Sequence, residues 1–128
     1  MKRAGQIVLT PFPHTDLSGA KLRPVLMLRP ASRYGDWLVC MVSSQLVQAE
    51  ADFDELLRTT DADFSASGLK VPSVLRLSRL AVLDSALMVG SMGMIADDRL
   101  ARIRQRLSEW IASDTLVFTK RLSHENQT

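Results

Sequence analysis

The spacing of apolar residues changes once along this chain, near residue 96, and that change restricts the folds open to it. Before that point the apolar residues form short runs or alternate with polar ones, which is typical of β-strands. After it, in "DDRLARIRQRLSEWIAS", they recur at the spacing of one helical stripe. The stripe consists of Leu100, Ile103, Leu107, Trp110 and Ile111. The sequence therefore predicts a sheet followed by one amphipathic helix.

The predicted helix begins with two acidic residues and carries four arginines off its apolar stripe. Asp97 or Asp98 is expected as the N-cap, because a short acidic side chain can accept hydrogen bonds from the first turn. The arginines are expected to form a solvated face of the helix, with contact to nucleic acid as the less favoured interpretation. They are Arg99, Arg102, Arg104 and Arg106.

Three short apolar segments in the first part of the chain are predicted to be strands, namely residues 7–12, 25–28 and 38–42. The second and third are apolar on both faces, which suits interior strands of a curled sheet. Cys40 lies within the third segment and is expected to be a core thiol. Residues 13–22 form a long polar connection, and we interpret them as a candidate functional loop.

The segment "SVLRLSRL" has a clear period of two, which predicts another strand. The alternation places Leu75 and Leu77 on one face and Val74, Arg76 and Ser78 on the other. Arg76 is therefore expected on the outer face of a half-buried strand.

Two further segments are less defined. Residues 86–95 predict a strand or a strand plus a turn, and residues 51–63 are compatible with either a strand or a short helix. Several short strands followed by one helix indicate a mainly β (α+β) domain, a small β-barrel or strongly curled sheet with the helix packed on it. We expect one domain over residues 1–122 and a flexible tail over residues 123–128.

Composition narrows the classes of function. No apolar run approaches the ~18 residues of a membrane span, and the start "MKRAGQIVL" lacks the features of a secretory signal, so a cytoplasmic protein is expected. One cysteine and two histidines predict neither an intramolecular disulfide nor a zinc site. The net charge of +2 is weak evidence for a nucleic-acid partner. However, an acidic middle segment offsets basic flanks, which is compatible with a local basic surface.

The segments "GQIVLTPFPHTDLSGAKLRPVLML", "CMVSSQ" and "SVLRLSRLAVLD", followed by a C-terminal helix, occur in an order that resembles the MazF/PemK family of toxin ribonucleases. The resemblance spans nearly the whole chain. It implies an SH3-like barrel of the MazF/PemK/CcdB type and a homodimer. It also implies cofactor-free, metal-independent cleavage of single-stranded RNA that an antitoxin protein blocks.

The resemblance also assigns roles to individual residues. Arg23, before a proline at the end of the first long loop, matches a catalytic arginine of the family. Ser43 matches the hydroxyl residue of an Ile-Thr-x-Gln type pattern, in which Gln45 is the glutamine and a candidate substrate-binding residue. Arg76 matches an arginine used in the PemK branch. Lys21 is a candidate phosphate contact. Pro24 biases Arg23 toward an extended backbone at the start of an apolar strand.

Cleavage without a metal would use the ribose 2'-OH as nucleophile, and the guanidinium of Arg23 is suited to stabilising charge on the phosphate. The chain departs from the family where an acid or base is expected. It lacks the glutamate of the first loop, and Ser78 stands where the PemK branch has an aspartate. His14 and Asp16 are candidate replacements, with His14 as the general base because its ordinary pKa suits proton transfer at neutral pH.

Two alternatives to an enzyme stay open. A non-catalytic member of the same fold could bind RNA or an antitoxin, or inhibit gyrase, although the tail "SHENQT" lacks the aromatic residue that gyrase poisoning implies. A purely structural or interaction module is the other alternative. If RNA is the ligand, Phe12, Tyr34 and Trp37 are the candidate stacking partners for its bases.

Overall fold

The computed structural model describes residues 2–11 and 21–114 of the chain. In this part the strands are β1 (Gln6–Pro11), β2 (Leu22–Pro30), β3 (Asp36–Ser43), β4 (Glu55–Leu57), β5 (Ser73–Asp84) and β6 (Gly90–Met94). The helices are α1 (Phe64–Ser67) and α2 (Asp97–Ile111), with short 3-10 turns η1 (Leu46–Gln48) and η2 (Ser85–Leu87).

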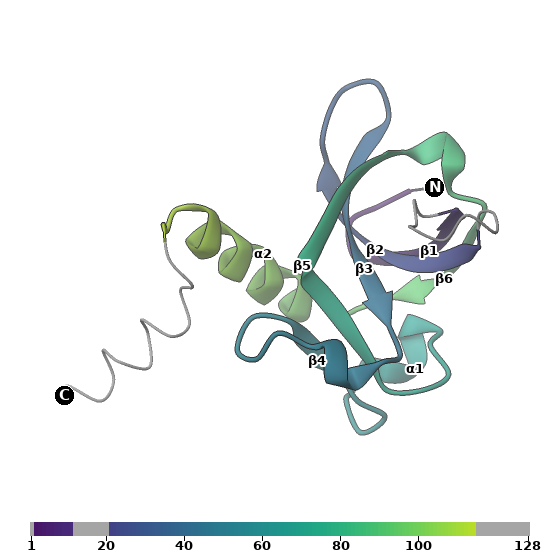
Figure 1. Cartoon of the computed structure of the whole chain (residues 1–128). Coiled ribbons are helices and arrows are strands. Elements are labelled where there is room, and N and C mark those ends of the chain that lie inside the picture. Colours follow the sequence, from purple (N-terminus) through teal and green to yellow (C-terminus); the bar gives the residue numbers. More distant parts are fainter. Residues whose placement is uncertain (1, 12–20, 115–128) are drawn as a thin grey trace.

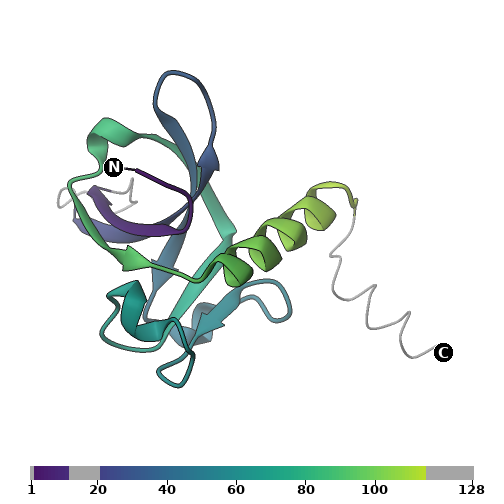
Figure 2. The same cartoon turned by 180° about the vertical axis from the view of Figure 1, so that it is seen from behind.

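The six strands form one sheet in the order β4-β5-β3-β2-β1-β6, and every pairing in it is antiparallel. The sheet curls strongly into a half-barrel, and α2 extends from it beside β4 and β5 (Figures 1 and 2). This confirms the predicted curled sheet with one C-terminal helix. The right-handed twist of each strand, which follows from the chirality of its residues, allows such a sheet to curl.

The curl buries apolar residues on both faces of the central strands. On one face Ile7, Leu26 and Cys40 pack with the apolar stripe of α2. On the other face Val8 and Val25 pack, among others, within the curl. This explains why residues 25–28 and 38–42 are apolar without alternation, as expected for interior strands.

The strand boundaries differ from the predictions at several places. β2 is longer than predicted and includes Pro24. Residues 51–63 contain the short strand β4 between turns, and residues 86–95 contain β6 after η2. The prediction that Val74 faces outward was wrong: it is fully buried, at a point where β5 is an interior strand with β3 on one side and β4 on the other. Phe12 and the tail 123–128 lie outside the described residues.

The N-terminus of α2 corrects two predictions. Its N-cap is Ala96, not an aspartate, and Asp97 and Asp98 lie in the first turn, where their charge still favours the helix dipole. The N–H of Ala96 donates to Asp63 at 2.9 Å, so this end of the helix is tied to the 58–63 segment. Ile111, predicted in the apolar stripe, is 70% exposed at the last residue of the helix.

The predicted solvated arginine face of α2 is also wrong in part. Arg99 is buried and bonded to three carboxylates, those of Glu55, Asp61 and Asp63. Arg104 donates to the carbonyl of Leu28, and Arg106 to that of Phe53. Arg102 and Arg104 are nevertheless exposed, and Arg102, with 49% of its side chain exposed, also pairs with Glu55. The expectation of a solvated face therefore holds for the exposure of Arg102 and Arg104 and fails for Arg99, and all four arginines also bond the helix to other segments.

Two glycines allow α1 to approach β6 closely. A Cβ on Gly93 would lie 2.1 Å from the carbonyl oxygen of Ala66, and one on Gly68 would lie 2.0 Å from that of Met92. Gly68 also has φ +77°, which favours glycine at the C-terminus of a helix.

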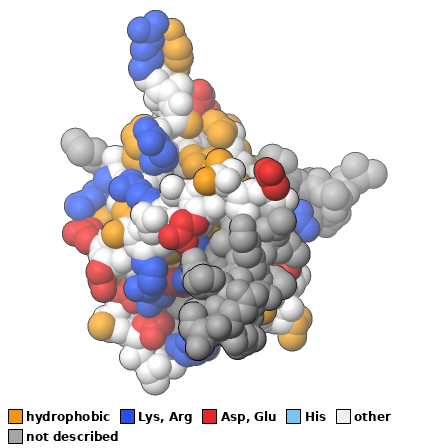
Figure 3. Space-filling model, turned by 90° about the vertical axis from the view of Figure 1, so that its left-hand side faces the viewer, with side chains coloured by type: hydrophobic (Ala, Val, Ile, Leu, Met, Phe, Trp, Pro, Cys, Tyr) orange, Lys and Arg blue, Asp and Glu red, His pale blue; other side chains and the backbone are white. Residues whose placement is uncertain are grey.

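Within the described residues, no helix is long and apolar enough to cross a membrane. Basic and acidic side chains are intermixed on the side of the molecule shown in Figure 3.

Candidate active site

A pocket of about 630 Å³ opens where β2 and β3 stop pairing with each other. The last pair between these strands at this end is Val25 with Met41. Beyond it, β2 continues along β1, with Arg23 opposite Thr10, while β3 continues along β5, with Ser43 opposite Val74. The sheet therefore splits here, and both strands present polar side chains to the gap.

The split also explains how β2 tolerates Pro24. Proline cannot donate to a strand ladder, so it is confined to places where one side of the strand is unpaired. β1 pairs with Pro24 through Leu9, but the ladder with β3 begins only at Val25. The Arg-Pro pair thus marks the point at which the sheet opens.

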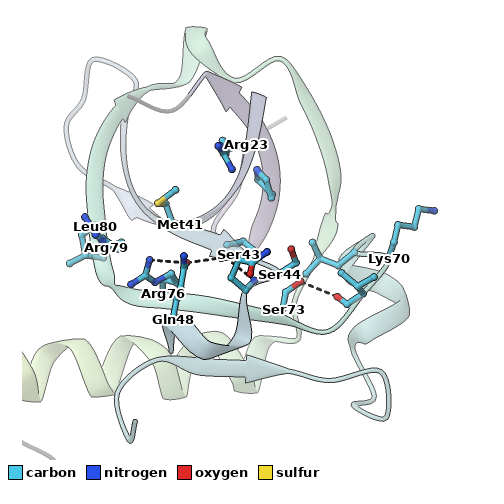
Figure 4. A pocket seen from close by; sticks show the side chains of 15 residues that line it. Arg23, Met41, Ser43, Ser44, Gln48, Lys70, Ser73, Arg76, Arg79 and Leu80 are labelled. Carbon is cyan, nitrogen blue, oxygen red and sulfur yellow. Dashed lines mark hydrogen bonds between the residues drawn. The ribbon is translucent and has the colours of Figure 1, made fainter. Parts of the chain in front are cut away.

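The pocket is lined by cationic, hydroxyl and amide side chains together with apolar ones such as Met41 and Leu80 (Figure 4). No acidic side chain lines it among residues 2–11 and 21–114. Its cations are Arg23, Lys70, Arg76 and Arg79. Its hydroxyl and amide groups belong to Ser43, Ser44, Gln45, Gln48 and Ser73. A pocket of this composition is suited to an anionic ligand such as a phosphate group.

Gln48 connects two of the predicted site residues. Its side-chain oxygen accepts from the Ser43 hydroxyl at 3.2 Å and from Arg76 Nη1 at 3.3 Å. The Ser43 hydroxyl in turn accepts from the N–H of Gln45 at 3.0 Å. Figure 4 shows this chain of bonds on one side of the pocket and Arg23 on the other. A ligand between them would contact cations from two separate strands.

A bulge in β5 brings two arginines into the pocket. Met41 of β3 pairs with Arg76, but the preceding Cys40 pairs with Leu80, so residues 77–79 have no partner on β3. In a regular strand, residues three apart point to opposite faces. Because of the bulge, Arg76 and Arg79 both line the pocket.

Four of the seven predicted site residues come together here: Arg23, Ser43, Gln45 and Arg76. Lys21 is exposed just before β2 and does not line the pocket. His14 and Asp16 lie outside the described residues.

The candidate stacking residues do not line the pocket as far as it is described. Tyr34 is 74% exposed in the loop between β2 and β3, where its ring contacts the guanidinium of Arg33. Trp37 packs against the core inside the curl. Neither aromatic ring is therefore placed to stack on a base bound beside Arg23 within a single chain.

Sequence reasoning missed Gln48, Lys70, Ser73 and Arg79 as pocket residues. Regular strand alternation places Arg79 on the face opposite Arg76, and the bulge that brings both to the pocket is not visible in the sequence. Gln48 follows the Ser-Ser-Gln segment by three residues, and its place in a 3-10 turn directly after β3 returns it to the pocket. A polar cluster directly after a predicted strand is the one signal that could have indicated it.

Cys40 is next to Met41 in sequence but faces the core and is fully buried. Burial raises the pKa of its thiol far above the ordinary range, and the negative charge of Asp54 raises it further. The thiol therefore stays protonated and is not a nucleophile. This confirms the expected core role.

None of the described residues form a cluster of three or more His, Cys, Asp or Glu side chains that could hold a metal ion. What the described pocket offers is fixed positive charge and hydrogen-bond donors. Such groups can bind a phosphate and stabilise added negative charge on its oxygens during a reaction.

Comparison with known proteins gives the family. None of the curated proteins compared matches the sequence. Among solved structures, the Mycobacterium tuberculosis toxin MazF-mt6 is similar, with a TM-score of 0.62 at 13% identity over 86% of this chain and 99% of that one. MazF (Form-I) from Deinococcus radiodurans is similar with a TM-score of 0.59 at 22% identity, over 88% of this chain and 97% of that one.

These likenesses establish the fold, and the predicted MazF-type curled sheet with a C-terminal helix is confirmed, as a half-barrel. The sequence itself matches the family model of the PemK-like, MazF-like toxins over residues 3–111. The match includes every described strand and helix and every described residue of the pocket. The chain belongs to the PemK-like, MazF-like toxin family of type II toxin-antitoxin systems.

Proposed function

We propose that this protein is a metal-independent endoribonuclease toxin that cleaves single-stranded RNA. The observation that carries the proposal is the pocket at the split between β2 and β3, where Arg23, Ser43 and Arg76 come together. Arginines that approach a phosphate from separate strands can neutralise its oxygens without a metal ion. Membership of a toxin family supports an activity directed at a cellular macromolecule.

In the proposed reaction the ribose 2'-oxygen attacks the adjacent phosphorus, and the bond from phosphorus to the 5'-oxygen breaks. The 2'-OH loses a proton, the 5'-oxygen gains one, and the products carry 2',3'-cyclic phosphate and 5'-OH ends. Arg23 stabilises the negative charge that develops on the non-bridging oxygens. Ser43 donates a hydrogen bond to the same phosphate, and Arg76 supplies a second cation.

The proton transfers need a group that arginine and serine do not provide. Arginine is a poor general base because it stays protonated at neutral pH. We assign this step to His14, with Asp16, two residues further along the chain, as a further polar contact. Outside the pocket, Lys21 precedes Arg23 by two residues and contributes positive charge for a neighbouring phosphate.

The substrate is single-stranded because attack by the 2'-oxygen requires a ribose that can rotate out of A-form geometry, and because unpaired bases are accessible for recognition. A homodimer and neutralisation by an antitoxin complete the proposal. Light scattering of the purified protein tests the dimer. Co-purification with the product of an adjacent small acidic reading frame tests the antitoxin.

The decisive experiment incubates purified protein with single-stranded RNA in EDTA and identifies the ends of the products. The proposal expects cyclic phosphate ends in the wild type and none with Arg23→Ala. Arg29→Ala is the matched control, since Arg29 lies on the same strand, is exposed and does not line the pocket. If the RNA stays intact at high protein excess, the proposed nuclease activity is overturned.

The second candidate is a non-catalytic protein that binds RNA or an antitoxin through the same pocket. The observation that favours it is the lack of any carboxylate or imidazole among the described residues that line the pocket. This candidate expects RNA binding that depends on Arg23 without any product, and unchanged binding in His14→Ala. Loss of cleavage in His14→Ala, with binding retained, supports the enzyme instead.

A further inference from the structure

A buried carboxylate lies behind the pocket, on the opposite side of Arg76 from Gln48. The side chain of Asp54 has no exposed surface and does not line the pocket. One of its oxygens lies 4.0 Å from Arg76 Nε. No other cation lies within that distance of its oxygens in the part of the chain that the structure describes.

The hydrogen bonds of Asp54 come from two segments. The N–H of Glu50 donates to it at 2.8 Å, which closes the turn over residues 50–54. The N–H and the hydroxyl of Ser78 both donate to it at 3.0 Å. Ser78 lies in the bulge of β5, so its N–H has no acceptor on β3. A buried N–H without an acceptor is costly, and Asp54 removes that cost at the bulge.

The same carboxylate fixes the guanidinium beside it. Arg76 Nε is buried and makes no hydrogen bond within residues 2–11 and 21–114, but it faces Asp54. Arg76 Nη1 points the other way, to Gln48 on the pocket side. With the Nε edge held by a negative charge, the terminal nitrogens are directed toward a ligand in the pocket.

We propose that Asp54 is a positioning residue for Arg76, which holds the β5 bulge and orients the guanidinium toward the substrate phosphate. This rests on the proposed function, since it specifies how the second cation of that site is aligned. Asp54 is fully covered and does not touch the substrate, so its effect passes through Arg76. Alignment of a charged group matters because a displacement of about 1 Å can cost roughly 100-fold in rate.

A double-mutant cycle on cleavage tests the proposal, with Asp54→Asn, Arg76→Ala and the double variant. Asp54→Asn is expected to lower kcat/KM about 10-fold or more, because a misaligned Arg76 both binds the substrate phosphate less well and stabilises its transition-state charge less. In the Arg76→Ala background the same change is expected to have no further effect. All rates are measured at a temperature at which each variant is folded. An equal loss in both backgrounds shows a merely structural role and overturns the proposal.

Two additions keep the test decisive. If Asp54→Asn does not fold, Ser78→Ala is used instead, because it retains the carboxylate but removes one of its hydrogen-bond donors. Ser78→Ala is expected to lower the cleavage rate by a smaller factor, and only when Arg76 is present. If the wild type does not cleave, the cycle is repeated on binding of a 2'-O-methyl single-stranded oligonucleotide by fluorescence anisotropy. If the effects of Asp54→Asn and Arg76→Ala on Kd are not additive, the positioning role of Asp54 is supported even though the proposed nuclease activity has failed. Additive effects overturn that role.

Discussion

Two arginines of this protein lie against carboxylates with opposite results. Arg99 of α2 donates to Asp63 at 2.8 and 3.0 Å, to Glu55 at 2.9 Å and to Asp61 at 3.1 Å. Arg76 of β5 has one carboxylate beside it, that of Asp54, at 4.0 Å. Both side chains are mostly buried, at 10% and 15% exposure.

The difference separates an arginine that holds the fold from one that can bind a ligand. The donors of Arg99 are engaged by protein acceptors, so it has little capacity for a phosphate. Arg76 keeps donors directed at a pocket that carries no acidic side chain in its described part. The number of carboxylates around a guanidinium therefore decides its role more than its burial does.

The largest expected effect is on stability, at Arg99. Arg99→Ala leaves Asp63 buried without its cation, while Glu55 keeps only Arg102 and Arg106, and breaking such a network costs about 3–5 kcal/mol. Urea denaturation measures the loss. Arg102→Ala is the matched control on the same helix, since its side chain is 49% exposed and its ion pair is worth under ~1 kcal/mol. Equal losses of unfolding free energy in the two variants would contradict the role of Arg99 as the arginine that holds the fold.

The next effect is on catalysis, at Arg23. Arg23→Ala is expected to lower cleavage by about 100- to 1,000-fold, the usual result of removing a donor that stabilises transition-state charge. Its melting temperature should stay close to the wild-type value. A large drop in melting temperature without a change in the rate per folded molecule would place Arg23 with Arg99, as a residue of the fold.

Acid should weaken the Arg99 region. The hydrogen bond from the Arg58 N–H and the charge of Arg99 lower the pKa of Asp61. Burial alone would raise the pKa of Asp63, but its bonds from Arg99 and Ala96 lower it overall. Carboxylates with lowered pKa values stabilise the fold above their unfolded pKa of about 3.9, and this stabilisation is lost as the pH falls through the folded values.

The free energy of unfolding should therefore decline below about pH 4, the ordinary range of aspartate. Denaturation curves at a series of pH values measure the decline. Asp63→Asn should show a shallower decline, because the variant has one fewer carboxylate to protonate. An unchanged slope in that variant would contradict the role given to Asp63.

The smallest effect is expected for the outlying cations of the pocket, Lys70 and Arg79. Alanine at either position should weaken RNA binding modestly and reduce the slope of log Kd against log salt by about one. Binding titrations at several salt concentrations measure the slope. Arg58→Ala is the control, because it removes an exposed charge outside the pocket. A slope that changes equally in the control would indicate that only the net charge matters.

The fold could be predicted largely from the sequence, because apolar periodicity reports which faces are buried. This periodicity predicted the curled sheet and the helix α2. The resemblance carried by the order of short motifs also named Arg23, Ser43, Gln45 and Arg76, which line one pocket in the structure. The helix arginines were misjudged because the stripe alone does not reveal which acids lie opposite, and Arg99 meets carboxylates 36 to 44 residues earlier in the chain.

By itself, the sequence determined the strands, the helix and the Arg-Pro pair at the opening of the sheet, because these depend on local pattern. Only the tertiary structure decided which charges are neutralised and which stay available. Arg79 reaches the pocket through a bulge, and Asp54 reaches Ser78 across 24 residues. Such contacts follow from strand register and chain crossing, and a shift of one residue in register would exchange the faces and remove them.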